Sequence, residues 1–72
     1  MKANTTTCFV YAQLENGITT QLERFQYPAQ ALAYMSKVAK RGYVGFIFRH
    51  KVCKLWAEYE NYDVRFATLN VA

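Results

Sequence analysis

Two alternating segments joined by a glycine-containing turn constrain the fold of this chain most strongly. Apolar residues occupy every second position from residue 8 to residue 14, and a second alternation runs from residue 18 to residue 25. A period of two is typical of β-strands that bury one face, so the sequence predicts two strands here. On the buried face of the first strand we expect Cys8, Val10, Ala12 and Leu14.

The turn between these strands can be assigned by comparing two registers. A two-residue loop at Asn16 and Gly17 would place Val10 opposite Glu23, which mixes the buried and the solvent face. A three-residue loop of residues 15–17, with Gly17 in the left-handed conformation after a type I turn, brings apolar positions together instead. The pairs that this second register predicts are Leu14 with Ile18, Ala12 with Thr20 and Val10 with Leu22.

The segment that begins at Pro28 and stops at Gly42 is predicted to be a helix. Proline fits the first helical turn, where its missing N–H costs nothing, and glycine is a natural stop after two basic residues. Apolar residues recur at helical spacing and define the face that we expect to be buried, namely Ala31, Leu32, Met35, Val38 and Ala39. The opposite face carries Gln30, Tyr34, Lys37, Lys40 and Arg41.

Three further strands are predicted after the helix. The first covers residues 43–51, and its inward side chains are Val44, Phe46 and Phe48. The second covers residues 53–59, and its inward side chains are Cys53, Leu55, Ala57 and Tyr59. A loop of residues 60–63 then places Glu58 opposite Arg65, a favourable cross-strand pair. The inward face of the last strand is completed by Val64, Phe66 and Thr68.

The resulting element order is β-β-α-β-β-β. We expect residues 1–72 to form a single two-layer α+β domain, with one antiparallel sheet packed on one helix. Cys8 and Cys53 lack the spacing of a metal site and the density of a disulfide scaffold, so we expect both to be reduced and buried. The polar N-terminus has no signal-peptide core and no apolar run is long enough to span a membrane, which predicts a cytosolic protein.

The charges are segregated along the chain. Residues 24–57 contain seven of the nine basic residues and none of the five acidic residues. Such a patch attracts an acidic protein surface or a phosphate backbone, and charge alone does not choose between them.

Motifs for catalysis are sparse in this sequence. The chain has one His and one Asp, without a Gly-rich phosphate loop, a Gly-x-Ser-x-Gly motif or a His/Cys cluster at metal-ligand spacing. His50 lies between two cations and has no orienting partner, while Glu58 and Glu60 fit solvated charges at a hairpin end. We therefore expect no enzymatic activity, no metal and no cofactor.

Two surfaces are candidates for binding a partner. The sheet face away from the helix would display aromatic and basic side chains together, namely Phe9, Tyr11, Ile47, Arg49, Lys51, Lys54, Trp56 and Arg65. Such a face can hold single-stranded nucleic acid, but it also serves as a protein-binding or homodimer contact. The second surface is the polar helix face, whose cations also complement the helix dipole.

The residues that we predict to bind a partner are Tyr34, Lys37, Lys40, Arg41, Arg49, Lys51, Lys54 and Trp56. The helix supplies the triplet Lys37, Lys40 and Arg41, and the sheet supplies the triplet Arg49, Lys51 and Lys54. We expect the two triplets to lie on different sides of a thin domain.

Residues 45–49 (Gly-Phe-Ile-Phe-Arg), residues 55–59 (Leu-Trp-Ala-Glu-Tyr) and the Arg65-Phe66 pair resemble the strand 3 to strand 5 region of small type I-F anti-CRISPR proteins. The order of elements is similar too, although the resemblance in sequence covers only the second half of the chain. It implies a basic, non-enzymatic inhibitor, encoded by a phage or mobile element, that binds a subunit of a crRNA-guided surveillance complex where nucleic acid would otherwise lie. The cations that would serve such binding are Lys37, Lys40, Arg41, Arg49 and Lys51.

The leading functional hypothesis is thus a small inhibitor that binds a host protein or ribonucleoprotein complex which handles nucleic acid. One alternative is a module that binds nucleic acid directly through the sheet face. Another is a homo-oligomeric structural or interaction protein whose open sheet face is its own interface.

Overall fold

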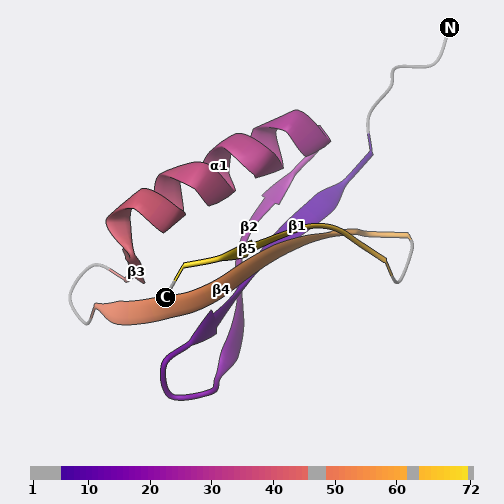
Figure 1. Ribbon diagram of the computed structural model, residues 1–72. Helices are drawn as coiled ribbons and strands as arrows, with labels where there is room; N and C mark the ends of the chain where they lie inside the picture. The colour runs from indigo at the N-terminus through magenta and orange to yellow at the C-terminus, as the bar shows by residue number, and fades with distance from the viewer. Residues whose placement is uncertain (1–5, 46–48, 62–63, 72) are drawn as a thin grey trace, which may run out of the picture.

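The computed structural model describes residues 6–45, 49–61 and 64–71, and it confirms the predicted α+β architecture. The elements, in the predicted order, are β1 (Cys8–Leu14), β2 (Thr19–Phe25), α1 (Pro28–Arg41), β3 (Tyr43–Val44), β4 (His50–Tyr59) and β5 (Arg65–Asn70). The strands form one antiparallel sheet, and α1 lies across one face of it (Figure 1). No helix in the described ranges is long and apolar enough to cross a membrane.

β4 is the central strand of the sheet. β1 pairs along one edge of β4 and is flanked in turn by β2, while β5 and the short β3 divide the opposite edge of β4 between them. The core fills the space between this sheet and α1, and it confirms the predicted inward face of β1. Its buried members are Cys8, Val10, Ala12, Leu14, Ala31, Met35, Val38, Val44, Val52, Leu55 and Ala57.

The turn between β1 and β2 confirms the three-residue loop. Gly17 has a φ of 87°, in the left-handed region that glycine tolerates, and its N–H donates to the Leu14 carbonyl at 2.9 Å. The Leu14 N–H donates to the Ile18 carbonyl at 2.9 Å, and Ala12 lies opposite Thr20 as predicted. Ile18 itself is exposed at the hairpin end.

The predicted pairing of Val10 with Leu22 is wrong. The register shifts between Val10 and Tyr11, so that Val10 lies opposite Glu23 and Leu22 is the extra residue of a β-bulge. Because of this bulge, Leu22 and Phe25 both pack against the core although they are three positions apart. Strict alternation would have turned one of them away.

α1 begins and ends where the sequence predicts, but its buried face is rotated. The helix stops at Gly42, whose φ is 80° and whose N–H donates to the Val38 carbonyl at 2.8 Å. Leu32, predicted to be buried, is 45% exposed, whereas Tyr34, predicted to be exposed, packs against the core. The buried stripe is centred on Ala31, Met35 and Val38. Leu32 is turned by about 100° from Ala31, which carries it out of that stripe.

The single strand predicted for residues 43–51 is also wrong. The chain reverses between β3 and β4, so that Tyr43 lies opposite Lys51 and Val44 lies opposite His50. Gly45, which follows β3, has a φ of 100° that few other residues would tolerate. Val44 is buried as predicted, while Phe46 and Phe48, which were also predicted to face inward, lie outside the described residues.

A second β-bulge, after the one in β2, lies in β4. The register shifts between Gln13 and Leu14, so Leu14 lies opposite Val52 and Cys53 becomes the extra residue. Val52 is therefore buried in the position predicted for Cys53, which is only half-buried. Both cysteines are free, as predicted, and Cys8 is buried.

The last hairpin confirms the predicted pairing of Glu58 with Arg65. Two positions of its loop, residues 62 and 63, lie outside the described residues. The register shifts between Ala57 and Glu58, which makes Phe66 the extra residue. Beyond this bulge Ala67 and Leu69 pack against the core, so the inward positions predicted for Val64 and Thr68 are wrong, and both of these side chains are exposed.

Candidate functional site

A helix cation and a cation beside the sheet meet at one aromatic ring. The guanidinium carbons of Arg41, at the end of α1, and Arg49, just before β4, lie 5.6 and 4.9 Å from the centroid of the Tyr43 ring. The chain reversal between β3 and β4 brings them together. The prediction that the two basic triplets lie on different sides of the domain is therefore wrong for Arg41 and Arg49.

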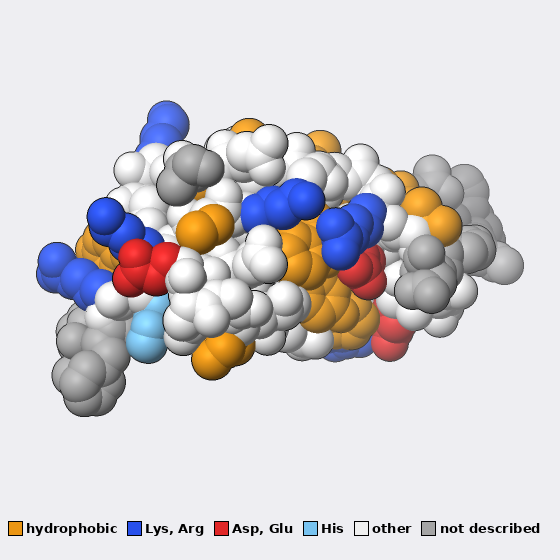
Figure 2. Space-filling view, turned by 60° about the horizontal axis from the view of Figure 1, so that its bottom comes forward, with side chains coloured by type: hydrophobic (Ala, Val, Ile, Leu, Met, Phe, Trp, Pro, Cys, Tyr) orange, Lys and Arg blue, Asp and Glu red, His pale blue; other side chains and the backbone are white. Residues whose placement is uncertain are grey.

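We call Arg41, Tyr43, Arg49 and Lys51 the basic end of the molecule. Lys51 belongs to it because it lies opposite Tyr43 in the sheet. The Glu15 N–H donates to the Lys51 carbonyl at 3.1 Å, so the fold also brings one acidic residue to this region. No salt bridge between described residues involves a cation of the basic end. Figure 2 shows several basic side chains and a histidine at one end of the molecule, with an acidic side chain among them.

The basic end suits recognition of an anion. Guanidinium groups present a planar fork of donors that matches a carboxylate or a phosphate, and a tyrosine ring beneath them restricts their motion. Arg41, Arg49 and Lys51 are all exposed, so these donors are accessible. His50 is exposed between Arg49 and Lys51 at the start of β4.

Trp56 lies on the sheet face away from α1, as predicted, but it is only 6% exposed. The Tyr11 ring stacks beside it with 5.8 Å between ring centroids, and the Arg65 guanidinium carbon lies 4.3 Å from its ring centroid. Its indole N–H donates to Glu58 Oε2 at 2.8 Å. Side chains of the protein itself therefore cover the indole ring, and Trp56 has little exposed surface for contact with a partner.

The charges of Glu58 and Arg65 on this sheet face compensate each other. Glu58 accepts the indole hydrogen bond and also lies 3.6 Å from Arg65 Nε. Burial raises the pKa of Tyr11, and the Glu58 carboxylate raises it further. Phe9 extends the aromatic row, with its ring centroid 6.3 Å from that of Tyr11. Figure 2 shows an apolar patch on the sheet side of the molecule with basic and acidic side chains directly beside it.

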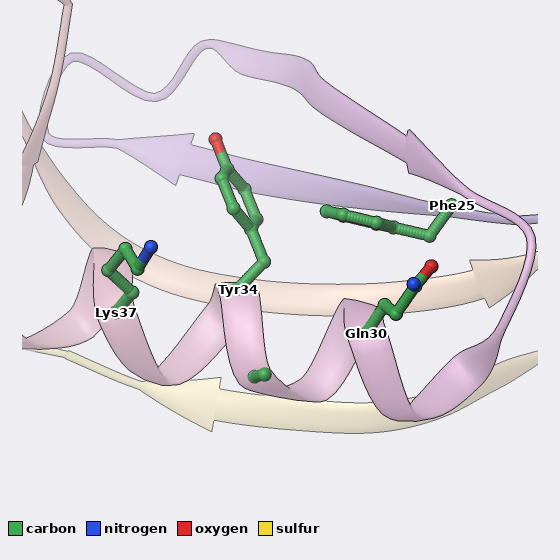
Figure 3. Close-up of a pocket in the computed structure, with 5 residues that line it drawn as sticks. Phe25, Gln30, Tyr34 and Lys37 are labelled. Carbon is green, nitrogen blue, oxygen red and sulfur yellow. The ribbon is translucent and has the colours of Figure 1, made fainter.

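A hollow of about 350 Å³ lies between α1 and β2 (Figure 3). It is lined by Phe25, Gln30, Ala33, Tyr34 and Lys37. The ring centroids of Phe25 and Tyr34 are 5.3 Å apart, and the ring planes are tilted by 51°. Burial raises the pKa of the Tyr34 hydroxyl, the Glu23 carboxylate adds to this rise, and the Arg41 guanidinium opposes it.

The hollow gathers two of the predicted site residues, Tyr34 and Lys37, and adds Phe25, which sequence reasoning missed. Strict alternation gives no reason to place Phe25 on the helix side together with Leu22, because the bulge that does so has no mark in the sequence. Of the remaining predicted residues, Lys40 is exposed in the last turn of α1, and Lys54 is half-buried opposite Gln13.

Within the described part of the chain, no group of three or more His, Cys, Asp or Glu side chains is arranged to hold a metal ion. Comparisons with models of protein families, with curated proteins and with solved structures found no match to this chain. The functional assignment therefore depends on the surfaces of the molecule itself.

Proposed function

We propose that the protein is a small non-enzymatic inhibitor that binds a nucleic-acid-handling complex of a host cell through its basic end. The observation that carries this proposal is the meeting of Arg41 and Arg49 at the Tyr43 ring. Grouping like charges at an exposed site adds little to folding, because exposed cation–π contacts and the helix dipole contribute only about 1 kcal/mol or less each and the two cations repel one another. The grouping is better explained by an anionic partner.

The sign of the charge also limits where such an inhibitor can bind. A channel that accepts nucleic acid is itself basic and would repel this end of the molecule, whereas an acidic surface beside the channel would attract it. Once docked, the body of the domain blocks access for nucleic acid. The resemblance to type I-F anti-CRISPR proteins implies that the target is a crRNA-guided surveillance complex and that a phage or mobile element encodes the inhibitor.

Direct binding of nucleic acid through the sheet face has weaker support. Stacking of bases requires exposed aromatic rings, and Trp56 is covered by Tyr11 and Arg65. The basic end does not depend on that face.

The proposal is tested by capture from nuclease-treated lysate of the natural host, using the tagged protein. We expect the wild-type protein to retain a nucleic-acid-handling complex and Arg41→Glu to lose most of it. The matched control is Arg24→Glu, an exposed cation of β2 that pairs with Phe9 at the opposite end of the sheet. It should retain the complex.

Two results would overturn the proposal. One is equal capture by wild type and Arg41→Glu. The other is tight binding to generic DNA or RNA oligonucleotides with a steep salt dependence and no protein captured, which is the behaviour of a direct nucleic-acid-binding module.

A further inference from the structure

The residues of α1 that line the hollow lie on the same side of the helix as Arg41 of the basic end. Ala33 and Tyr34 come three and four residues after Gln30, Lys37 comes four and three residues after them, and Arg41 comes four residues after Lys37. Residues at these spacings are neighbours on a helix surface. The Arg41 guanidinium also opposes the rise in the pKa of the Tyr34 hydroxyl.

The chemistry of the hollow combines an apolar interior with a cationic rim. Phe25, Ala33 and Tyr34 supply apolar surface, and Figure 3 shows the Tyr34 and Phe25 side chains between α1 and the strands, with Lys37 to one side and Gln30 to the other. Lys37 is exposed and forms no salt bridge with another described residue. Among the described residues, the acidic group that raises the pKa of Tyr34 is Glu23, while the cations Lys37 and Arg41 lie on the same side of the helix as Tyr34.

The size and shape of the hollow limit what it can hold. At about 350 Å³ it lies near the lower end of the range of ligand pockets, which is about 300–1,000 Å³. This volume is sufficient to receive an aromatic or long aliphatic side chain of a partner. Because the Phe25 and Tyr34 ring planes are tilted by 51°, they line a notch and do not form a flat platform on which a base could stack.

We propose that this hollow receives an aromatic or long aliphatic side chain from an acidic peptide segment of the partner protein, while Lys37 and Arg41 bind the carboxylates beside it. This inference rests on the proposed function and specifies the chemistry of its partner. An apolar anchor in a pocket with charges at its rim is the arrangement that concentrates binding energy in protein interfaces. It would explain why a basic protein selects one acidic surface among many.

The experiment uses two synthetic peptides with blocked ends and a fluorescent label. Both carry the same number of Asp and Glu residues, and they differ only at the central position, which is Phe in one and Ser in the other. A single-stranded DNA oligonucleotide is the third probe. We expect the Phe peptide to bind the full-length protein at least about tenfold more tightly than the Ser peptide, which corresponds to about 1.4 kcal/mol.

Two variants of α1 test whether the hollow is responsible. Ala33→Leu fills the hollow without changing charge, and Ser36→Leu makes a comparable change at an exposed position that does not line it. We expect Ala33→Leu to abolish the preference for Phe over Ser and Ser36→Leu to keep it. Thermal melting of both variants checks that they remain folded.

The inference is overturned if the Phe and Ser peptides bind equally, if neither binds, or if Ala33→Leu keeps the preference for Phe. It is also overturned if the oligonucleotide binds more tightly than the Phe peptide. These results differ from a failure of the proposed function, which is seen when Arg41→Glu leaves capture of the host complex unchanged. If both peptides bind equally and Arg41→Glu abolishes this binding, the proposed function stands. Only the inference that an apolar side chain enters the hollow is then overturned.

Discussion

The guanidinium group of Arg65 covers the indole of Trp56, with its central carbon 4.3 Å from the ring centroid. The two residues come from neighbouring strands, and Glu58 joins them by accepting the indole N–H and pairing with Arg65. An aromatic residue that looks available for a partner in the sequence is therefore packed by its own chain. Trp56 was predicted to bind a partner, but these contacts make it part of the structural framework of the sheet.

Replacing Trp56 should consequently affect stability more than binding. We expect Trp56→Ala to lower the free energy of unfolding by about 3–5 kcal/mol, the usual cost of removing a buried large aromatic side chain. Arg65→Ala should cost about 1 kcal/mol, because it removes one cation–π contact and one surface ion pair. Urea denaturation measures both. A Trp56→Ala protein of wild-type stability that fails to capture its partner would restore Trp56 to the binding surface.

The rotated face of α1 leads to a second prediction. Met35 is 3% exposed and Leu32 is 45% exposed, although both were expected in the buried stripe. Met35→Asp should abolish cooperative unfolding, because it buries a charge without a partner. Leu32→Asp, one turn earlier on the same helix, should cost about 1 kcal/mol or less. Similar melting curves for the two variants would contradict the observed orientation of the helix.

The first turn gives a third prediction. Gly17→Val should lower the free energy of unfolding by about 1–3 kcal/mol, because a β-branched residue is strained at positive φ. Nothing lies within 4 Å of an added Cβ at Gly17, so the cost comes from the backbone alone. Asn16→Asp is the control, since its side-chain oxygen can still accept the Ile18 N–H that Asn16 Oδ1 accepts at 3.0 Å. Equal losses in the two variants would argue against backbone strain at Gly17.

Local patterns were sufficient to predict most of the architecture. The Gly17 turn, Pro28 and Gly42 mark the ends of β1 and α1, and they depend only on neighbouring residues. The errors in strand register cluster instead at bulges, where the extra residue is Leu22, Cys53 or Phe66. A bulge shifts every later side chain by one position, and it is decided by how neighbouring strands fit together. Alternation within one strand cannot reveal it.

The sequence was sufficient to predict which residue types form the candidate site, but not which of these residues lie together in space. The acid-free segment contains Arg41, Arg49 and Lys51, and none of these cations forms a salt bridge with another described residue. Their meeting at Tyr43 depends on the chain reversal between β3 and β4, which a run of strand-forming residues concealed. The hollow depends on the bulge at Leu22 in the same way.

A fourth prediction concerns alkaline pH. Burial raises the pKa of Cys8 above its ordinary 9.0 and the pKa of Tyr11 and Tyr34 above their ordinary 10.0. The folded protein thus keeps protons that the unfolded chain releases. The stability contributed by these groups is complete below pH 9.0 and is lost as pH rises through their raised values.

Urea denaturation at a series of pH values measures this loss. Tyr34→Phe removes one of the three groups, so its stability should fall less steeply above the ordinary tyrosine pKa than that of the wild type. Parallel pH profiles for the two proteins would contradict a raised pKa at Tyr34.

The last prediction concerns Arg41 and Arg49, which both contact the Tyr43 ring. Arg41→Glu and Arg49→Glu should each weaken binding to the captured complex by about 2 kcal/mol or more, because the reversed charge repels an acidic surface. Arg24→Glu should have little effect. The free energy of unfolding should change little. At Arg41 the loss of the favourable interaction with the helix dipole should cost about 1 kcal/mol or less. Since both guanidinium groups contact Tyr43, the double variant should lose less affinity than the two single losses combined.

Additive losses would show that Arg41 and Arg49 contact the partner independently, in spite of the ring that they share. A silent Arg41→Glu combined with complete loss in Arg49→Glu and Lys54→Glu would identify the sheet as the binding surface. In that case neither α1 nor the hollow beside it would contact the partner. Affinity measured at two salt concentrations strengthens the comparison, because only contacts between exposed charges weaken markedly as salt is added.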